Sequence, residues 1–528
     1  MKTLEELTFA STFTEELPGD KETKNSIRQV EDALYSFVSP SLPSSEPYLV
    51  GYSKDACDLL GMAGEECKRP EFPLVMSGQA HFGAERGYAH CYGGHQFGTW
   101  AGQLGDGRVI NLGEVVTDAG QRWEMQLKGV GRTPYSRFAD GLAVMRSSIR
   151  EFVASEAMYH LKVPTSRALC IVGTGQSVLR DMFYNGDAKM EPGAAVCRLA
   201  PTFVRFGSFN LPPSRGESQI HLSKKLADWL IKYHFPQYEG SDEKYLEMFR
   251  EVCESTGKMV AAWQGVGFVH GVMNTDNMSI LGLTIDYGPY GFLDKFDPAY
   301  TPNITDLRGG GRYAFRNQPE ICQWNLVRLA TSLVAAGLIE KTDAEEAVGR
   351  YAEVMTSSYT ETMARKLGLV AYNKELSGEL MKNMFEDEAD FTNTFRAMSS
   401  VTTTPPEGES MDFIPEQLLS AIGGDLSDER KTAWRAWLSD YRAALQKDGL
   451  SEKDRMAMQN LTNPKYIPRQ HLLQWAIEGA EKGDNSELER LIKVVTAPFD
   501  EHEGMEKYCQ PPPEDMVKPG VSMLSCSS

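Results

Sequence analysis

Alternating polar and apolar positions in the first half of the chain predict β-strands. Residues 109–112 form a short run typical of a β-strand. In residues 122–128 the side chains of Trp123, Met125 and Leu127 fall on one face, while Lys128 faces the other way. Glycine-rich turns separate these runs. We therefore expect a mixed, strand-rich region over residues 91–210.

Apolar residues at helical spacing predict the remaining elements. One helix within the strand-rich region is expected to begin near Ser147 or Ser148 and to carry Glu151 in its first turns. From about residue 220 onward helical spacing dominates, interrupted by a passage rich in Gly, Asn and Asp at residues 265–291. The apolar stretch 326–339 contains polar residues and is too short to cross a bilayer, so we interpret it as a core helix.

These patterns predict an α+β fold with a sheet-rich part, a helical part and a helical appendix. A length of 528 residues allows about two to four domain-sized units. The first of them is loop-rich, with Ser and Pro clustered at residues 38–47, and is expected to be an extension packed on a larger core. The predicted units are residues 1–90, 91–215, 216–390 and 391–528.

Charge and cysteine content restrict the class of protein. A net charge of −19 and a sequence pI near 5.1 argue against binding to nucleic acid or to an anionic membrane, so a phosphate site must be a local basic pocket. The first residues lack the continuous apolar segment of a secretory signal. Nine cysteines without any CxxC pair suggest a reducing compartment. One of them, Cys526, is the third residue from the end, where an exposed thiol could react.

Three features of the strand-rich region are candidate parts of an ATP-phosphate site. The turn Gly105-Asp-Gly107-Arg108 could bring backbone amides and a positive charge to a phosphate, although such turns are more often simple hairpins. Lys128 ends a predicted strand, and Glu151 follows on the predicted helix. A strand lysine paired with a helix glutamate orients ATP phosphates in protein kinases, whereas the alternative is a solvated lysine.

The segment from His270 to Gly288 has the most specific pattern. His270 and Asn277 have the spacing of the kinase catalytic loop, and Asp286-Tyr-Gly stands where kinases have Asp-Phe-Gly. Oxygen ligands such as those of Asn277 and Asp286 suit Mg²⁺. Val272, however, occupies the position of the kinase aspartate and cannot accept a proton. Either the chain binds ATP without catalysis, or Asp276 replaces that aspartate; Asp276 could equally be a turn carboxylate.

Two arginines, Arg198 and Arg205, lie in apolar surroundings and therefore need a buried partner. A nucleotide phosphate is one candidate, and a structural carboxylate is the commoner one. Both alternatives stay open on the sequence.

Taken together, the motifs resemble those of the selenoprotein O family of protein adenylyltransferases. The resemblance covers most of the chain and is carried by long strings: Tyr92-Gly-Gly-His-Gln-Phe-Gly, Gly102-Gln-Leu-Gly-Asp-Gly-Arg108, Arg146-Ser-Ser-Ile-Arg-Glu151, Arg205-Phe-Gly-Ser, His270-Gly-Val-Met-Asn-Thr-Asp-Asn-Met-Ser279, Gly282-Leu-Thr-Ile-Asp-Tyr-Gly-Pro289, Asn463-Pro-Lys-Tyr and the final Cys526-Ser-Ser.

The resemblance implies a two-lobed, protein-kinase-like fold that binds ATP in a flipped orientation and transfers AMP to Ser, Thr or Tyr hydroxyls of other proteins, with a link to redox homeostasis. It implies Asp276 as the proton acceptor, Asn277 and Asp286 as ligands of Mg²⁺ (with Mn²⁺ as an alternative), and Glu151 as the partner of Lys128. The residues that it places at the nucleotide are Gly105, Gly107, Arg108, Lys128, Asp140, Gly141, Arg198, Arg205 and Asp286.

The resemblance also has a limit near the end of the chain. Cys526 stands where some relatives carry selenocysteine, so a redox role is expected for it. Some bacterial relatives have a cysteine available to pair with the tail, but residues 301–306 have a proline there, which puts that disulfide in doubt; Cys322 or Cys509 could substitute.

Two other functions stay open: a phosphotransferase that uses the γ-phosphate, and an ATP-binding protein without catalysis. We expect a monomer whose partners are ATP and protein substrates, located in mitochondria if the source is eukaryotic and in the cytoplasm if it is bacterial.

Overall fold

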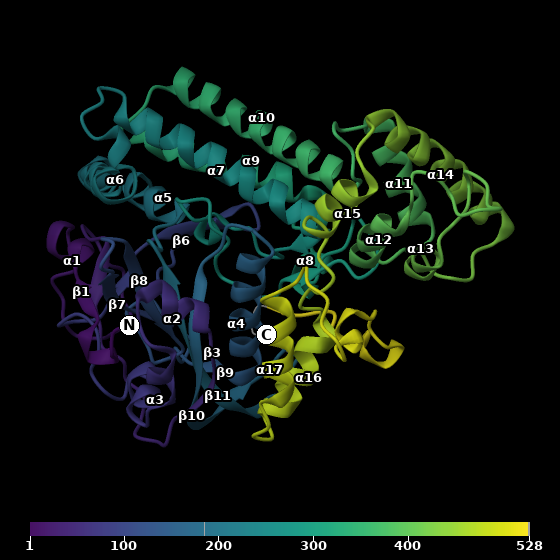
Figure 1. Cartoon of the computed structure of the whole chain (residues 1–528). Helices are drawn as coiled ribbons and strands as arrows, with labels where there is room; N and C mark the ends of the chain where they lie inside the picture. The colour runs from purple at the N-terminus through teal and green to yellow at the C-terminus, as the bar shows by residue number, and fades with distance from the viewer. Residues whose placement is uncertain (184, 526–528) are drawn as a thin grey trace.

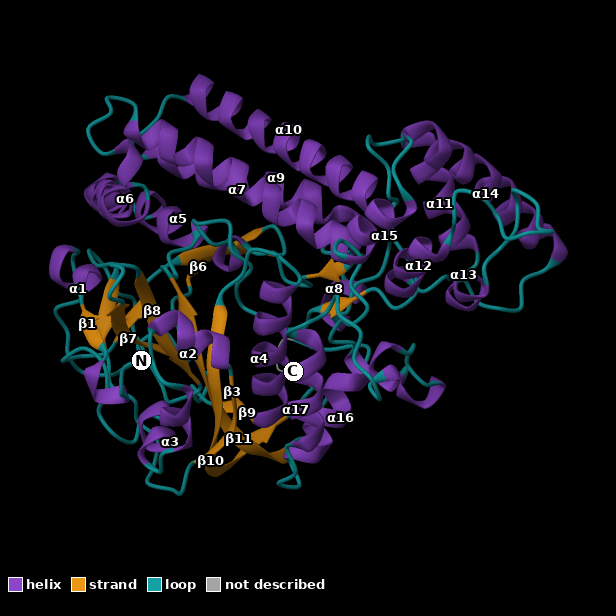
Figure 2. Cartoon of the chain, in the orientation of Figure 1, coloured by secondary structure: helices purple, strands orange, loops and turns teal. Residues whose placement is uncertain are grey.

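The structure, a computed structural model, describes residues 1–183 and 185–525. Figure 2 shows one large sheet beside many helices, which confirms the α+β class. Among the described residues, nine strands form this antiparallel sheet. They are β1 (Thr8–Ala10), β2 (Tyr35–Phe37), β3 (Tyr48–Tyr52), β4 (Tyr88–His90), β7 (Val109–Val116), β8 (Arg122–Lys128), β9 (Ala143–Val144), β10 (Arg167–Arg180) and β11 (Lys189–Ala200).

The order of the strands is β2-β4-β7-β8-β11-β10-β3, with β1 added to β7 and β9 added to β11. The segment before residue 90 therefore does more than wrap around the core, because it supplies β1 to β4. It also supplies the short helices α1 (Thr12–Glu16), α2 (Lys54–Leu60) and α3 (Glu71–Met76).

Alternation along the strands separates two buried layers. On β8, Met125 and Leu127 pack with side chains of α2 and α3 on one face of the sheet. The opposite face is covered by α4 (Met145–His160), and α16 (Gln470–Ala480) and α17 (Ser486–Val495) pack against α4 (Figure 1). As predicted, Lys128 points away from the apolar layer of Leu127, and so it faces α4.

The helix α4 begins earlier than the sequence suggests. It starts at Met145, and neither Ser147 nor Ser148 is its N-cap. The reason is that Val144, the residue before the helix, still pairs with Gly193 of β11, so the chain passes directly from strand to helix. This short connection fixes Glu151 relative to the sheet.

A helical region follows the sheet. Figure 1 shows α7 and α10 side by side along its length, with α9 beside them. The predicted core helix near residue 326 is part of α9, where Leu326 and Leu329 are fully buried. The helices of this region are α5 (Phe206–Ser214), α6 (Ile220–His234), α7 (Lys244–Val266), α8 (Ile304–Arg308), α9 (Gln318–Ala335) and α10 (Lys341–Lys366). Between α7 and α8 the chain is mostly irregular apart from β12 (Phe268–Val269) and β13 (Gly291–Phe292), as the sequence indicated for residues 265–291.

The last group of helices has an apolar core of its own. Figure 1 shows it projecting from the main body before α16 and α17 return to α4. No helix in residues 1–183 or 185–525 has the length and apolar character needed to cross a membrane. The members of the group are α11 (Lys374–Glu386), α12 (Phe391–Ala397), α13 (Glu416–Ala421), α14 (Asp428–Asp448) and α15 (Glu452–Asn460).

The cysteines whose positions are described are reduced, and all of them except Cys509 are buried. The Cys322 thiol lies 3.8 Å from the Met273 sulfur in the core. Cys526 lies outside the described residues, so its predicted redox role stays a prediction.

Lys366, at the end of α10, is buried against Phe395, whose ring centroid lies 4.2 Å from the Nζ atom. Burial lowers the pKa of Lys366 from 10.5 to about 7. We expect Lys366→Met to raise the free energy of unfolding at about pH 7 by on the order of 3 kcal/mol, because folding then no longer desolvates or deprotonates an ammonium group.

The sign of the pH dependence follows from the lowered pKa. Between about pH 7 and pH 10.5 the unfolded wild type binds more protons at Lys366 than the folded protein, so the wild type gains stability as the pH rises. The advantage of Lys366→Met should therefore shrink in chemical denaturation at about pH 9.5. A variant less stable than the wild type at both pH values would show that the contact with Phe395 outweighs the burial cost.

Candidate active site

A buried ion pair joins the sheet to α4. Lys128 Nζ at the end of β8 lies 2.5 Å from Glu151 Oε2, and both side chains are almost completely buried. Burial lowers the pKa of Lys128 to about 8, and the nearby Arg198 and Arg108 add to this effect against the opposing charge of Glu151. Lys128 is therefore not a solvated strand lysine.

Arg198 of β11 lies on the same face of the sheet and connects this pair to Asp286. Its guanidinium donates to Glu151 and, over 3.1 Å, to Asp286 Oδ1. The same Asp286 oxygen is 3.8 Å from Lys128 Nζ. Burial alone would raise the pKa of Asp286, but the charges of Lys128, Arg198, Arg205 and Arg108 hold it well below its usual range.

Asp276 lies in the single turn formed by Thr275–Asn277. Its Oδ2 accepts a hydrogen bond from Gln96 over 3.2 Å, while its buried Oδ1 has no hydrogen-bond partner. Burial raises the pKa of Asp276 to about 6. A buried carboxylate with a free oxygen is suited to receive a proton or to contact a cation.

The backbone around Asp276 is tightly held. Arg205 Nη1 donates to the Asp276 carbonyl over 2.8 Å, and Asn277 Nδ2 donates to the Val272 carbonyl over 2.9 Å. The ring of His270 contacts the carbonyl of Ile285, with 3.0 Å between Nε2 and the oxygen. These contacts bring residues 270–277 and the segment at Ile285, next to Asp286, into one cluster.

The glycine turn after β6 has steric reasons for its composition. Gly105 has φ +76°, and a Cβ there would lie 2.4 Å from the ring of Tyr135. A Cβ on Gly107 would lie 3.1 Å from the Tyr135 carbonyl oxygen. Arg108 follows the turn and lies close enough to lower the pKa of both Lys128 and Asp286. The turn therefore places the positive charge of Arg108 near the cluster of charged residues.

Two of the predicted nucleotide residues, Asp140 and Gly141, have their described contacts with other residues. Asp140 forms an ion pair with Arg180, with 2.7 Å between Oδ2 and Nη1. Gly141 has φ +76°, and a Cβ there would lie 2.2 Å from the Gly131 carbonyl oxygen. Their observed contacts are thus within the loop that follows β8 and with β10.

Arg205 contacts two residues, Tyr92 and Asp106, that the sequence did not single out. Its guanidinium carbon lies 4.4 Å from the centroid of the Tyr92 ring, and Nη2 lies 3.8 Å from Asp106 Oδ1. The Tyr92 hydroxyl donates to the same Asp106 oxygen over 3.1 Å. Gln96, the partner of Asp276, was also missed, although Tyr92 and Gln96 both lie in the string Tyr92-Gly-Gly-His-Gln-Phe-Gly.

The side-chain oxygen atoms of Asp276, Asn277 and Asp286 are of the type that Mg²⁺ prefers. Oδ1 of Asp276 has no hydrogen-bond partner among the described residues and could therefore coordinate a metal ion. The part of the chain that the structure describes has no group of three or more His, Cys, Asp and Glu side chains that could hold a metal ion alone. This donor set fits a Mg²⁺ ion whose remaining ligands are phosphate oxygens and water, as is usual when Mg²⁺ accompanies a nucleotide.

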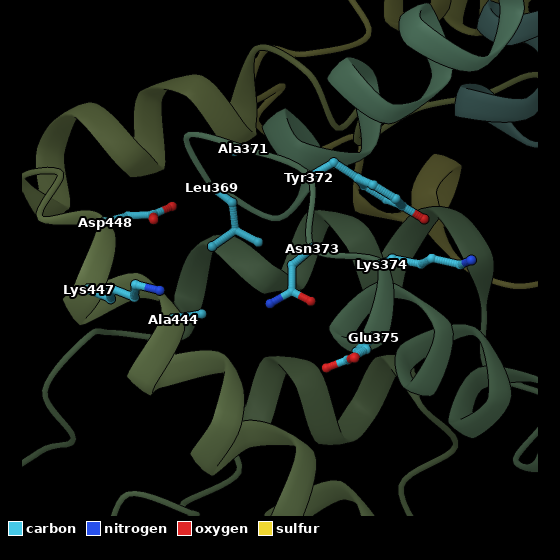
Figure 3. Close-up of a pocket in the computed structure, with 9 residues that line it drawn as sticks. All are labelled: Leu369, Ala371, Tyr372, Asn373, Lys374, Glu375, Ala444, Lys447 and Asp448. Carbon is cyan, nitrogen blue, oxygen red and sulfur yellow. The ribbon is translucent and has the colours of Figure 1, made fainter.

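The cavity drawn in Figure 3 is separate from these residues. It has a volume of about 360 Å³ and lies between the loop that carries Leu369 and Tyr372 and the end of α14 at Lys447 and Asp448. None of its lining residues belongs to the cluster around Lys128. It is a feature of the C-terminal helices.

A strand lysine paired with a helix glutamate, with a further buried arginine on the same glutamate, resembles the arrangement used by enzymes that transfer a phosphate-containing group from a nucleotide. Comparison with known proteins agrees with this class. Residues 21–496 match the family model described as protein adenylyltransferase SelO. The chain therefore belongs to the protein adenylyltransferase SelO family, and the resemblance stated from its motifs is confirmed.

Relatives match over nearly their whole length. The chain is 48% identical to the protein nucleotidyltransferase YdiU of Azoarcus sp. (strain BH72), with 99% of both chains covered. It is 45% identical to the protein of the same name from Methylobacillus flagellatus, with 99% of this chain and 100% of the relative covered. The identity to the protein of that name from Rhodopirellula baltica is 44%, with 99% of both chains covered.

Proposed function

We propose that this chain transfers AMP from ATP to Ser, Thr or Tyr hydroxyls of other proteins and releases pyrophosphate. The observation that carries the proposal is the joined cluster of Lys128, Glu151, Arg198 and Asp286 beside the free carboxylate oxygen of Asp276. Membership of the SelO family supplies the type of group that is transferred.

We further infer a two-lobed, kinase-like arrangement. The sheet with α4 would be the first lobe, α5 to α10 the second, and the charged cluster the ATP site between them. The predicted boundaries near residues 90, 215 and 390 are part of this proposal. It is supported by the position of Lys128 on a strand and Glu151 on α4, which is the pairing that kinases use.

In the proposed reaction the acceptor oxygen forms a bond to the α-phosphorus of ATP while the bond from that phosphorus to pyrophosphate breaks. The hydroxyl proton goes to Oδ1 of Asp276, which is unpartnered in the structure. The negative charge that moves onto pyrophosphate is neutralised by four basic side chains, those of Lys128, Arg198, Arg205 and Arg108. A Mg²⁺ ion held by Asn277 and Asp286, with Mn²⁺ as the alternative, would neutralise phosphate charge.

Val272 favours AMP transfer over γ-phosphoryl transfer. It is almost completely buried at the position where a kinase has its proton-accepting aspartate. A hydroxyl placed for attack on the γ-phosphorus would lack that acceptor there, whereas Asp276 offers one elsewhere in the loop.

We expect ³²P from α-labelled ATP, but not from γ-labelled ATP, to appear on protein when the chain is incubated with Mg²⁺ and a bacterial protein extract that has been heated to inactivate its own kinases. The reason is that only the α-phosphate stays with the acceptor. Label from γ-labelled ATP alone would mean a phosphotransferase, and no label from either would mean an ATP-binding protein without catalysis. Asp276→Ala is the control that should remove the label.

We infer that the partners of this chain are ATP and proteins that carry hydroxyl groups. We also infer that the chain works as a monomer. Because the relatives are bacterial proteins, we infer the cytoplasm rather than a mitochondrion. A redox function of Cys526 and a disulfide to Cys322 or Cys509 stay predictions.

A further inference from the structure

A cavity of about 290 Å³ opens beside the hairpin of β5 (Gly93–Gln96) and β6 (Thr99–Gln103). The hairpin packs on α5 through β5, and β6 can be found near that helix in Figure 1. The cavity is lined by His95 and Trp100 of the hairpin, by Asn210 of α5 and by Arg328 of α9. None of the proposed nucleotide or metal residues lines it.

The hairpin is fixed to the loop that carries Asp276. The His95 amide donates to Thr275 Oγ1 over 2.8 Å, and the Phe97 amide donates to Asn274 Oδ1 over 3.2 Å. A Cβ on Gly94 would lie 2.4 Å from Asp276 Oδ1, so backbone and carboxylate are in direct contact. A molecule bound against the hairpin therefore has a defined position relative to Asp276.

Arg328 lines the cavity, and Arg312 lies beside the hairpin at Gly98. Neither forms an ion pair with a described residue, although the charge of Arg312 acts on Asp306 and Tyr313. The guanidinium carbons of Arg312 and Arg328 lie 4.9 and 5.1 Å from the centroid of the Trp324 ring. Within the described ranges, neither arginine has a carboxylate oxygen within 4.0 Å, so the interaction of Arg312 with Asp306 is a longer-range one. The Nε atoms of both are buried and have no acceptor, and Asn210, which is 4% exposed, has no donor for its Oδ1. In a chain of net charge −19, such arginines are available for an anion.

Two aromatic side chains are exposed on the same hairpin. Phe97 is 39% exposed and Trp100 is 36% exposed. Arginine and large aromatic residues are enriched where proteins bind each other, and here they lie next to the proposed proton acceptor.

We propose that Phe97, Trp100, Arg312 and Arg328, together called the acceptor surface, bind the protein substrate through a Glu or Asp side chain that lies near the acceptor hydroxyl in its sequence. The carboxylate would contact Arg328 and Arg312, and apolar atoms of the same segment would cover Phe97 and Trp100. This inference rests on the proposed function and adds to it the class of acceptor: hydroxyl groups within acidic segments.

The first test compares synthetic peptides that contain one Thr flanked by Glu, by Gln or by Lys, with α-labelled ATP and Mg²⁺. We expect the wild type to label the Glu peptide with a kcat/KM about tenfold above that of the Gln peptide. Arg328→Glu should reverse the ranking in favour of the Lys peptide. Arg365→Glu, the same change at an exposed arginine in the last turn of α10, should keep the wild-type ranking.

The second test does not depend on catalysis. Fluorescence anisotropy of the Glu peptide, carrying a fluorescent dye, should show saturable binding to the wild type that weakens with added salt. The peptide should bind about tenfold more weakly to Arg328→Glu or to Arg312→Gln. The variants should first be compared with the wild type in thermal unfolding.

The outcomes separate the two proposals. Equal labelling of Glu and Gln peptides by the wild type, an unchanged ranking in Arg328→Glu, or no binding of the Glu peptide would overturn the acceptor surface. If the Glu peptide binds the wild type more tightly than it binds Arg328→Glu, but no peptide becomes labelled, the proposal of the acceptor surface would stand and that of AMP transfer would be overturned. Asp286→Asn should remove labelling of all peptides alike, which distinguishes a catalytic defect from a changed ranking.

Discussion

Replacing Asp286 with asparagine is expected to lower the rate of AMP transfer by at least about 10³-fold, since a metal ion that neutralises phosphate charge contributes several kcal/mol to the transition state and each 1.36 kcal/mol corresponds to a factor of ten. Asparagine retains the size of the side chain and tolerates the left-handed backbone of Asp286, whose φ is +62°. The fold should persist because Lys128 and Arg198 both keep their contact with Glu151.

The measurement is the initial rate of ³²P incorporation from α-labelled ATP over a range of Mg²⁺ concentrations, accompanied by thermal unfolding. Asp297→Asn is the matched control, because the Asp297 side chain accepts, among the described contacts, only the hydrogen bond from the nearby Ala299 amide. A rate for Asp286→Asn within tenfold of the wild type would contradict the assignment of Asp286 as a metal ligand.

The sequence predicted the sheet and helices well where one face of an element is buried. The alternation in residues 122–128 placed Lys128 opposite Leu127, and the structure has this arrangement. The start of α4 was wrong because serine is a common N-cap, while here the preceding residue Val144 is held by β11 instead. The contribution of the first 90 residues to the sheet was missed because strands such as Tyr35–Phe37 and Tyr88–His90 are too short to show a periodic pattern.

Local spacing also predicted much of the candidate site. One continuous motif contains His270, Asn277 and Asp286, so we could expect these three residues to lie close together. The contact of Gln96 with Asp276 could not, because it joins residues 180 positions apart and depends on how the hairpin packs on α5. Asp106, the partner of Tyr92 and Arg205, was overlooked because it stands inside a glycine turn, where Asp usually has a local role.

The last prediction concerns the proton. Asp276→Asn should lower kcat by about 10²–10⁴-fold, the usual contribution of a general base, while the affinity for ATP changes little. The reason is that asparagine keeps the shape of Asp276 and its contact with Gln96 but cannot accept the proton of the attacking hydroxyl. Single-turnover transfer from α-labelled ATP gives the chemical rate, and equilibrium binding of a fluorescent ATP analogue gives the affinity.

The dependence on Mg²⁺ separates this role from that of a metal ligand. If Asp276 only receives a proton, the Mg²⁺ concentration that gives half of the maximal rate should be the same for Asp276→Asn as for the wild type. For Asp286→Asn this concentration should be higher. A higher Mg²⁺ requirement in Asp276→Asn would instead mean that its unpartnered Oδ1 binds the metal. A kcat within a few-fold of the wild type would remove Asp276 from the mechanism, and the hydroxyl would then have to lose its proton to water or to phosphate.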